Sequence, residues 1–152
     1  MMSSNNKGFA ASLAMGAIFI VLGILEIAAG WIKEDWMNWL SAGGNFVLGL
    51  VLMVIGAVFL FAARGFRSGR DGDAFLMVGC GLALFIGLVA LLTLAANASE
   101  AYLLGNEDFA EWSPVDDFSP TIVMMVPALA LLYRQLKAFW AAPEAKAAEV
   151  KQ

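Results

Sequence analysis

Four apolar stretches, separated by short polar segments, organise the chain. The first three cover residues 9–32, 42–63 and 74–98. A helix of about 20 residues crosses the hydrocarbon core of a bilayer, and each of these stretches is longer than that. The pattern therefore predicts three transmembrane helices, joined by polar turns.

The fourth apolar stretch is shorter and has two interpretations. It runs from Thr121 to Tyr133, before Arg134 and Lys137 interrupt it. It is either a full span over residues 119–140, whose two cationic side chains reach into the lipid headgroups, or an interfacial or re-entrant segment bent at Pro127.

The distribution of basic residues favours the full span. With four spans, eight of the nine Lys and Arg residues fall on one side of the membrane and only Lys33 falls on the other, whereas three spans would divide them almost evenly. Because basic residues collect in cytoplasmic loops, we expect four transmembrane helices with both termini in the cytoplasm. The residues on the shared side are Lys7, Arg64, Arg67, Arg70, Arg134, Lys137, Lys146 and Lys151.

Composition agrees with a membrane protein and removes several kinds of chemistry. The 152 residues are 61 % hydrophobic and 14 % charged, whereas soluble domains are about 45–50 % apolar and about 25 % charged. The chain has no histidine and one cysteine, which excludes His-ligated haem, a His-based triad and an iron–sulfur cluster. We expect an all-α integral membrane protein with one membrane domain over residues 1–152, no catalytic site, no metal, no cofactor and no nucleic-acid partner.

Small residues recur along the first three spans at helical spacing. The first two spans carry glycines every seven residues, and the third carries small residues every four residues. Because small side chains let helix backbones approach closely inside a membrane, we expect these positions to form helix–helix contacts. They are Gly16, Gly23, Gly49, Gly56, Gly79, Ala83 and Gly87.

Two polar residues interrupt otherwise apolar spans. Glu26 precedes the end of the first span by six residues, which places it about 9 Å below the outer end. A carboxylate at this depth costs about 2–3 kcal/mol against lipid. We therefore expect Glu26 to point into the bundle, with Asn45 of the second span as a buried polar partner. The contact either fixes the helix register or handles ions or protons.

The two segments predicted outside the membrane differ in character. Residues 33–41 place Trp36 and Trp39 on one helical face, opposite charged residues, which is typical of an interfacial segment in an aromatic belt. The loop over residues 99–118 carries six acidic residues and no basic residue. It is either a solvated acidic loop or a docking surface for a partner protein. The docking residues would be Glu107, Asp108, Phe109, Glu111, Trp112, Asp116 and Asp117, and residues 141–152 would form a cytoplasmic tail.

These features favour a small non-catalytic accessory or assembly subunit of a larger membrane complex for electron transfer, ion translocation or transport. The alternative is a small oligomeric transporter or channel that uses Glu26, since ionisable groups inside a membrane are functional candidates. The expected partners are membrane lipids, together with other membrane subunits or further copies of this chain. The expected location is the plasma (inner) membrane of a prokaryote.

Overall fold

The computed structural model describes residues 4–32, 44–105, 107, 111–115 and 117–149. Within these residues the chain is helical and contains no strand. Four helices are long and apolar enough to cross a membrane, which confirms the predicted all-α membrane fold. The elements are α1 (Ser4–Ala29), α3 (Phe46–Ser68), α4 (Gly72–Ser99), the π-helical segment η1 (Glu100–Leu104) and α5 (Pro120–Glu149).

The fourth span is a full helix. α5 continues through Pro127 without a break, and it is long and apolar enough to cross a membrane. Its membrane-compatible part is Pro120–Trp140. Residues 141–149, expected to be a tail, continue the helix instead. They are rich in Ala, Glu and Lys, which are strong helix formers.

Several predicted helix boundaries are corrected by the structure. α3 begins at Phe46 rather than at residue 42, and it ends where Gly69 adopts a left-handed conformation with φ of 68°. The third helical stretch continues through η1 to Leu104, so the acidic loop begins at Gly105 rather than at residue 99. Apolar residues Tyr102 to Leu104 extend the helix beyond the polar Asn97 and Ser99 that mark the expected end. The interfacial segment expected over residues 33–41 lies outside the described residues.

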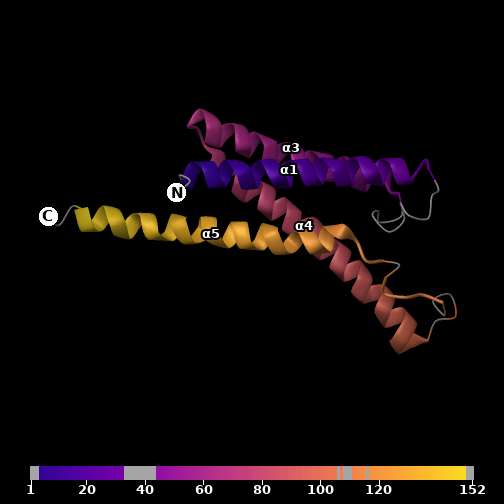
Figure 1. Ribbon diagram of the computed structural model, residues 1–152. Helices are drawn as coiled ribbons and strands as arrows, with labels where there is room; N and C mark the ends of the chain where they lie inside the picture. The colour runs from indigo at the N-terminus through magenta and orange to yellow at the C-terminus, as the bar shows by residue number, and fades with distance from the viewer. Residues whose placement is uncertain (1–3, 33–43, 106, 108–110, 116, 150–152) are drawn as a thin grey trace.

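The helices are arranged as a close pair, α1 and α3, and two further helices, α4 and α5 (Figure 1). α1 and α3 lie side by side in antiparallel order, while α4 crosses them obliquely and carries its C-terminal end away from the pair. α5 packs mainly on α4 and runs back toward the end at which α1 begins. Both ends of the described chain therefore lie at the same end of the bundle.

Glycines set the spacing between α1 and α3. A Cβ atom at Gly16 would lie 3.0 Å from the carbonyl oxygen of Gly56. One at Gly23 would lie 2.6 Å from the carbonyl oxygen of Gly49. The two helices thus meet glycine on glycine. Because they are antiparallel, Gly16 pairs with Gly56 and Gly23 pairs with Gly49. Close backbone contact of this kind drives helix association where lipid removes the hydrophobic effect.

The small residues of α4 divide between two neighbours. Gly79 faces α3, where its Cβ atom would stand 3.1 Å from the ring of Phe59. Gly87 faces α5, where its Cβ atom would contact Met125 and stand 3.0 Å from the carbonyl oxygen of Thr121. Ala83 lies between them and is fully buried. The stripe on α4 therefore serves two helix contacts in succession.

A small core closes the centre of the bundle. Phe19 of α1 stacks on Phe59 of α3 with ring centroids 5.8 Å apart. Leu76 and Cys80 of α4 and Ala128 of α5 are buried against them. This packed layer separates two polar regions at the opposite ends of the bundle.

Candidate functional site at the acidic end

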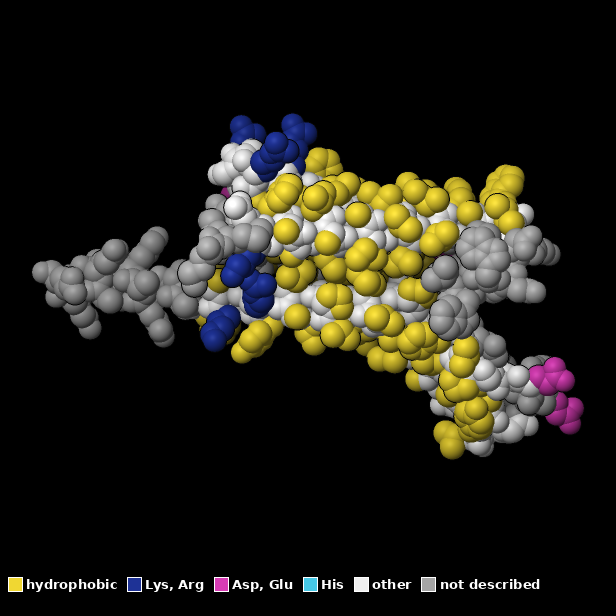
Figure 2. All heavy atoms as spheres, in the orientation of Figure 1, with side chains coloured by type: hydrophobic (Ala, Val, Ile, Leu, Met, Phe, Trp, Pro, Cys, Tyr) yellow, Lys and Arg dark blue, Asp and Glu magenta, His cyan; other side chains and the backbone are white. Residues whose placement is uncertain are grey.

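Charge is divided between the two ends of the molecule (Figure 2). Lys and Arg side chains gather where the chain begins, and an acidic group marks the tip of the oblique helix. The basic end contains Lys7, Arg64, Arg67, Arg70, Arg134 and Lys137; the acidic end contains Glu100, Glu107, Glu111 and Asp117. Among the described residues no Lys or Arg lies at the acidic end. These two regions are called the basic end and the acidic end.

Glu26 joins α1 to the start of α3. Its side chain is 2 % exposed, and its Oε1 accepts a 2.8 Å hydrogen bond from the backbone N–H of Asn45. Asn45 is the N-terminal cap of α3. The first N–H groups of a helix lack helical partners and carry the positive end of its dipole, so a carboxyl group from the neighbouring helix suits this position.

Asn45 itself differs from the expectation of a buried polar partner. Its side chain is exposed, and its Oδ1 accepts hydrogen bonds from the backbone of Val47 at 3.0 Å and of Leu48 at 3.1 Å. Because α3 begins at Phe46, Asn45 precedes the first residue of the helix and does not lie inside it. It meets Glu26 through its backbone and caps the helix with its side chain, as Asn commonly does.

Asp117 organises the segment that leads into α5. Its Oδ2 accepts a 2.6 Å hydrogen bond from Nδ2 of Asn97 on α4 and a 2.7 Å bond from Nε1 of Trp112. The Trp112 ring also meets Tyr102 edge to face, with centroids 5.9 Å apart. The loop is therefore folded back on the end of α4 by a carboxylate with two donors.

Four of the seven residues expected to dock a partner are among the described residues, and they differ in exposure. Asp117 and Trp112 bind each other inside the loop, whereas Glu107 and Glu111 are exposed. Asp108, Phe109 and Asp116 lie outside the described residues. Exposed apolar residues that the sequence did not single out end the helical stretch that precedes Glu107 in the chain. They are Tyr102, Leu103 and Leu104, at 67 %, 81 % and 76 % exposure.

The segment from Asp117 to Thr121 separates two cavities. Asp117, Ser119 and Thr121 line a pocket on one side, while Phe118 and Pro120 line a cavity on the other. Alternate residues thus face opposite ways, as they do in extended chain. The segment presents a polar face toward α4 and an apolar face toward α1.

The first of these cavities, called the polar pocket below, has a volume of about 330 Å³. It lies between the start of α3, the outer half of α4 and the start of α5. Ser119 and Thr121 are 4 % and 2 % exposed, and their hydroxyl groups lie 2.8 Å apart. The lining residues are Asn45, Leu48, Ile86, Val89, Ala90, Thr93, Asp117, Ser119 and Thr121.

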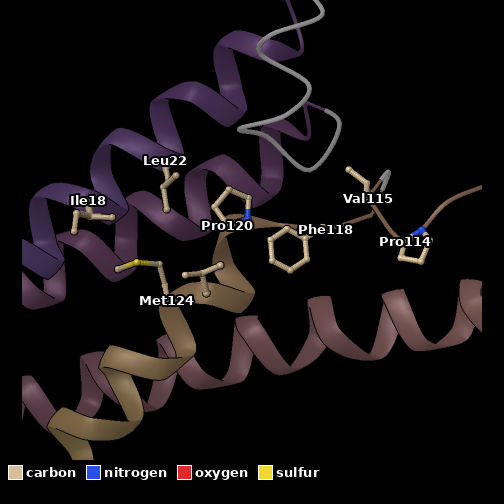
Figure 3. Close-up of a pocket in the computed structure, with 8 residues that line it drawn as sticks. Ile18, Leu22, Pro114, Val115, Phe118, Pro120 and Met124 are labelled. Carbon is tan, nitrogen blue, oxygen red and sulfur yellow. The ribbon is translucent and has the colours of Figure 1, made fainter.

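The second cavity is larger, at about 540 Å³, and all of its lining side chains are apolar. In Figure 3, Ile18 and Leu22 of α1 face Met124 of α5, and Phe118 and Pro120 stand between the helices. Pro114, Val115 and Val123 complete the lining. No polar side chain among the lining residues could orient a ligand there, and lipid chains suit such a surface.

Sequence reasoning missed three of the polar residues that line the polar pocket. Thr93, Ser119 and Thr121 are common residues at helix ends and inside apolar helices, where a hydroxyl group bonds to the preceding turn. Thr93 does this, since its Oγ1 donates to the carbonyl oxygen of Val89 at 3.1 Å. Only the alternation of polar residues at 117, 119 and 121 could have indicated a shared face.

These observations first define a class, a multi-pass integral membrane protein with four membrane-compatible helices. The chain belongs to the family of the MJ0565 integral membrane domain, which matches residues 3–138. It is similar to "Uncharacterized protein MJ0565" of the archaeon Methanocaldococcus jannaschii. The two are 32 % identical over 130 residues, which cover 83 % of this chain and 86 % of the relative. No solved structure matches the chain.

Proposed function

We propose that this protein is a non-catalytic accessory or assembly subunit of a larger membrane protein complex, and that its partner docks on the tip of α4. The observation that carries the proposal is an apolar patch at the end of a helix too long for the bilayer. The patch consists of Tyr102, Leu103 and Leu104, and it is called the apolar tip below.

The length of α4 and η1 places the apolar tip outside the hydrocarbon core. The apolar helical stretch Gly72–Leu104 has 33 residues, which corresponds to about 50 Å. Membrane helices tilt by up to about 40°, and at that tilt a core of about 30 Å holds about 26 residues. The remaining residues extend beyond the core. Since Asp71 and Asp73 mark the start of α4 at the basic end, the extension lies at the acidic end.

The chemistry of the apolar tip suits a protein partner. Leu103 and Leu104 are large apolar side chains that lipid tails do not reach once they leave the core. Contiguous exposed apolar residues mark interaction sites, and interfaces combine an apolar centre with a charged rim. Glu107 and Glu111 supply such a rim. A partner with an apolar groove flanked by basic residues would fit this surface.

The transporter alternative has weaker support. It depends on Glu26, and polar asparagines inside the spans or a helix break at Pro127 would add to its support. Glu26 bonds to the backbone at the start of α3, Asn97 bonds to Asp117, and α5 is continuous. These polar groups stabilise contacts between elements of the chain, which is the pattern of structural groups.

Location follows from the same arrangement. The positive-inside rule assigns the basic end to the cytoplasm, so the apolar tip would meet its partner on the outer face of a prokaryotic plasma membrane. The archaeal origin of the relative supports a prokaryotic setting.

Site-specific photo-crosslinking in native membranes tests the proposal. A benzophenone amino acid at Leu103 should give an adduct with a discrete membrane protein, whereas one at Val54, which is 60 % exposed in the middle of α3, should give lipid adducts alone. Leu103→Lys with Leu104→Lys should abolish co-purification of that protein in mild detergent and leave the melting temperature unchanged. An adduct of twice the mass of the chain would identify a second copy as the partner. Equal crosslinking at both positions, with a chain that purifies alone, would contradict the proposal.

A further inference from the structure

The polar pocket has the size and the lining of a small-molecule site. Its volume of about 330 Å³ lies at the lower end of the range of about 300–1,000 Å³ typical of ligand pockets. Apolar residues of α3 and α4 line it together with polar residues from the start of α3, from α4, from the segment before α5 and from the first turn of α5. None of the lining residues belongs to the apolar tip, so this site and the proposed docking surface are separate.

Asp117 is the charged residue of the lining. Asn97 and Trp112 both donate to its Oδ2, at 2.6 Å and 2.7 Å. Two donors from different elements fix the orientation of the carboxylate before any ligand arrives. Among the described residues both bonds reach Oδ2, which leaves Oδ1 as the atom that a ligand would meet.

The other polar groups of the pocket can accept hydrogen bonds from a ligand. Thr93 uses its hydroxyl proton on the carbonyl oxygen of Val89, which leaves its lone pairs for a donor. The hydroxyl groups of Ser119 and Thr121 share a hydrogen bond, and Oγ of Ser119 also accepts a 3.3 Å bond from the backbone N–H of Thr121. Oγ1 of Thr121 retains acceptor capacity for a ligand. No Lys or Arg lines the pocket, and none lies at the acidic end among the described residues.

We propose that the polar pocket binds a small organic cation with an alkylated ammonium group. A quaternary ammonium has no N–H to donate, so it lies against Oδ1 of Asp117 through its charge, and its alkyl groups pack on Leu48, Ile86 and Val89. A hydroxyl group of the ligand would donate to the oxygen of Thr93 or Thr121. The surrounding carboxylates of the acidic end raise the local concentration of cations.

Other ligand classes fit the pocket less well. A transition-metal ion needs several carboxylate, thiolate or imidazole ligands, and the described residues contain no cluster of three such side chains. An anion would be repelled by Asp117. A neutral molecule would leave the partly buried carboxylate of Asp117 without a countercharge.

Calorimetric titration of the purified full chain in mild detergent tests the proposal with two matched probes. Choline carries a quaternary ammonium, and 3,3-dimethylbutan-1-ol has nearly the same shape without the charge. We expect saturable binding of choline, and binding of the neutral alcohol weaker by about tenfold or more, as expected for the loss of a contact to a charged group.

Two variants locate the binding in the polar pocket. Asp117→Asn keeps an oxygen for Asn97 and Trp112 but removes the charge, so choline affinity should fall about tenfold or more while the alcohol is unaffected. Ala90→Phe fills the pocket and should abolish binding of both probes. Glu111→Gln removes an exposed carboxylate outside the lining and should bind choline as the wild type does.

Several outcomes would overturn the proposal. One is the absence of saturable binding of both choline and tetramethylammonium. The others are equal binding of choline and the neutral alcohol, and an equal loss of choline affinity in Glu111→Gln and Asp117→Asn. Normal choline binding by Ala90→Phe would overturn it as well. This last variant retains every polar group of the site, so it decides the question even if Asp117→Asn fails to fold.

Discussion

Gly23 of α1 and Gly49 of α3 face each other so closely that neither position can hold a methyl group. A Cβ atom at Gly23 would lie 2.6 Å from the carbonyl oxygen of Gly49, and one at Gly49 would lie 2.8 Å from the carbonyl oxygen of Gly23. Both obstacles are backbone atoms, so no change of rotamer relieves them. The pair therefore sets the distance between the two helices that make the most extensive contact in the chain.

Replacing one of these glycines should separate α1 from α3. We expect Gly23→Ala to lower the free energy of unfolding by about 1–3 kcal/mol, because the helices must move apart to admit the methyl group. Gly81→Ala is the matched control, since a Cβ atom at Gly81 meets nothing within 4 Å. It should be neutral or stabilising by up to about 1 kcal/mol through helix propensity. Thermal unfolding in detergent, followed by circular dichroism, measures both; equal effects would contradict the close contact.

The hydrogen bond between Glu26 and Asn45 should be structural. Glu26→Gln keeps an acceptor oxygen for the backbone N–H of Asn45 and should leave the melting temperature nearly unchanged. Glu26→Ala removes the acceptor and should destabilise the chain by about 1–3 kcal/mol, because a backbone donor at the start of α3 loses its partner. The same thermal melts compare the two variants. An alanine variant as stable as the wild type would show that the bond contributes nothing.

Ser12 offers a stabilising substitution. Its hydroxyl group is fully buried and has no hydrogen-bond partner among the described residues. Ser12→Ala removes an unsatisfied polar atom and should raise stability by about 1 kcal/mol. Ser119→Ala is the contrasting control, since the Ser119 hydroxyl lies 2.8 Å from that of Thr121. That variant should be less stable than the wild type. The reverse order of melting temperatures would contradict the burial of Ser12.

The sidedness of the protein can be read by labelling cysteines in intact cells. The single natural cysteine, Cys80, is buried, so Cys80→Ala provides a background with few side effects. In that background Ser113→Cys, at the acidic end, should react with an impermeant maleimide added outside. Ser68→Cys, at the basic end, should react only after the cells are permeabilised, because basic residues stay in the cytoplasm. Labelling of both from the same side would reject the four-span topology.

The four membrane-compatible helices are the part of the fold that local sequence is sufficient to predict. Apolar length and the placement of Lys and Arg predicted the four spans, since crossing a bilayer depends on hydrophobicity summed over one segment. The same signal does not mark the end of a helix outside the core. Tyr102 to Leu104 continue α4 as helix, although the polar residues before them indicated a loop.

The glycines of α1 and α3 show what the tertiary structure adds to the spacing in the sequence. Their seven-residue spacing places Gly16 with Gly23 on one helix face, and Gly49 with Gly56 on another, because the period nearly equals two helical turns. Spacing alone leaves open which glycine meets which. The antiparallel register of α1 and α3 pairs Gly16 with Gly56 and Gly23 with Gly49, and register depends on the whole interface.

The hydrogen-bond partners of the polar groups were determined by the tertiary structure alone. The sequence indicated that Glu26 needs a partner inside the bundle, but the partner is the backbone of Asn45, whose availability depends on where α3 begins. Asp117 looked like one of several loop acids, and only the fold brings it to Asn97 and to the polar pocket. Hydropathy is a property of a segment, whereas a hydrogen bond requires two atoms from distant parts of the chain to meet within about 3 Å. Only the packed arrangement of the helices decides which atoms do so.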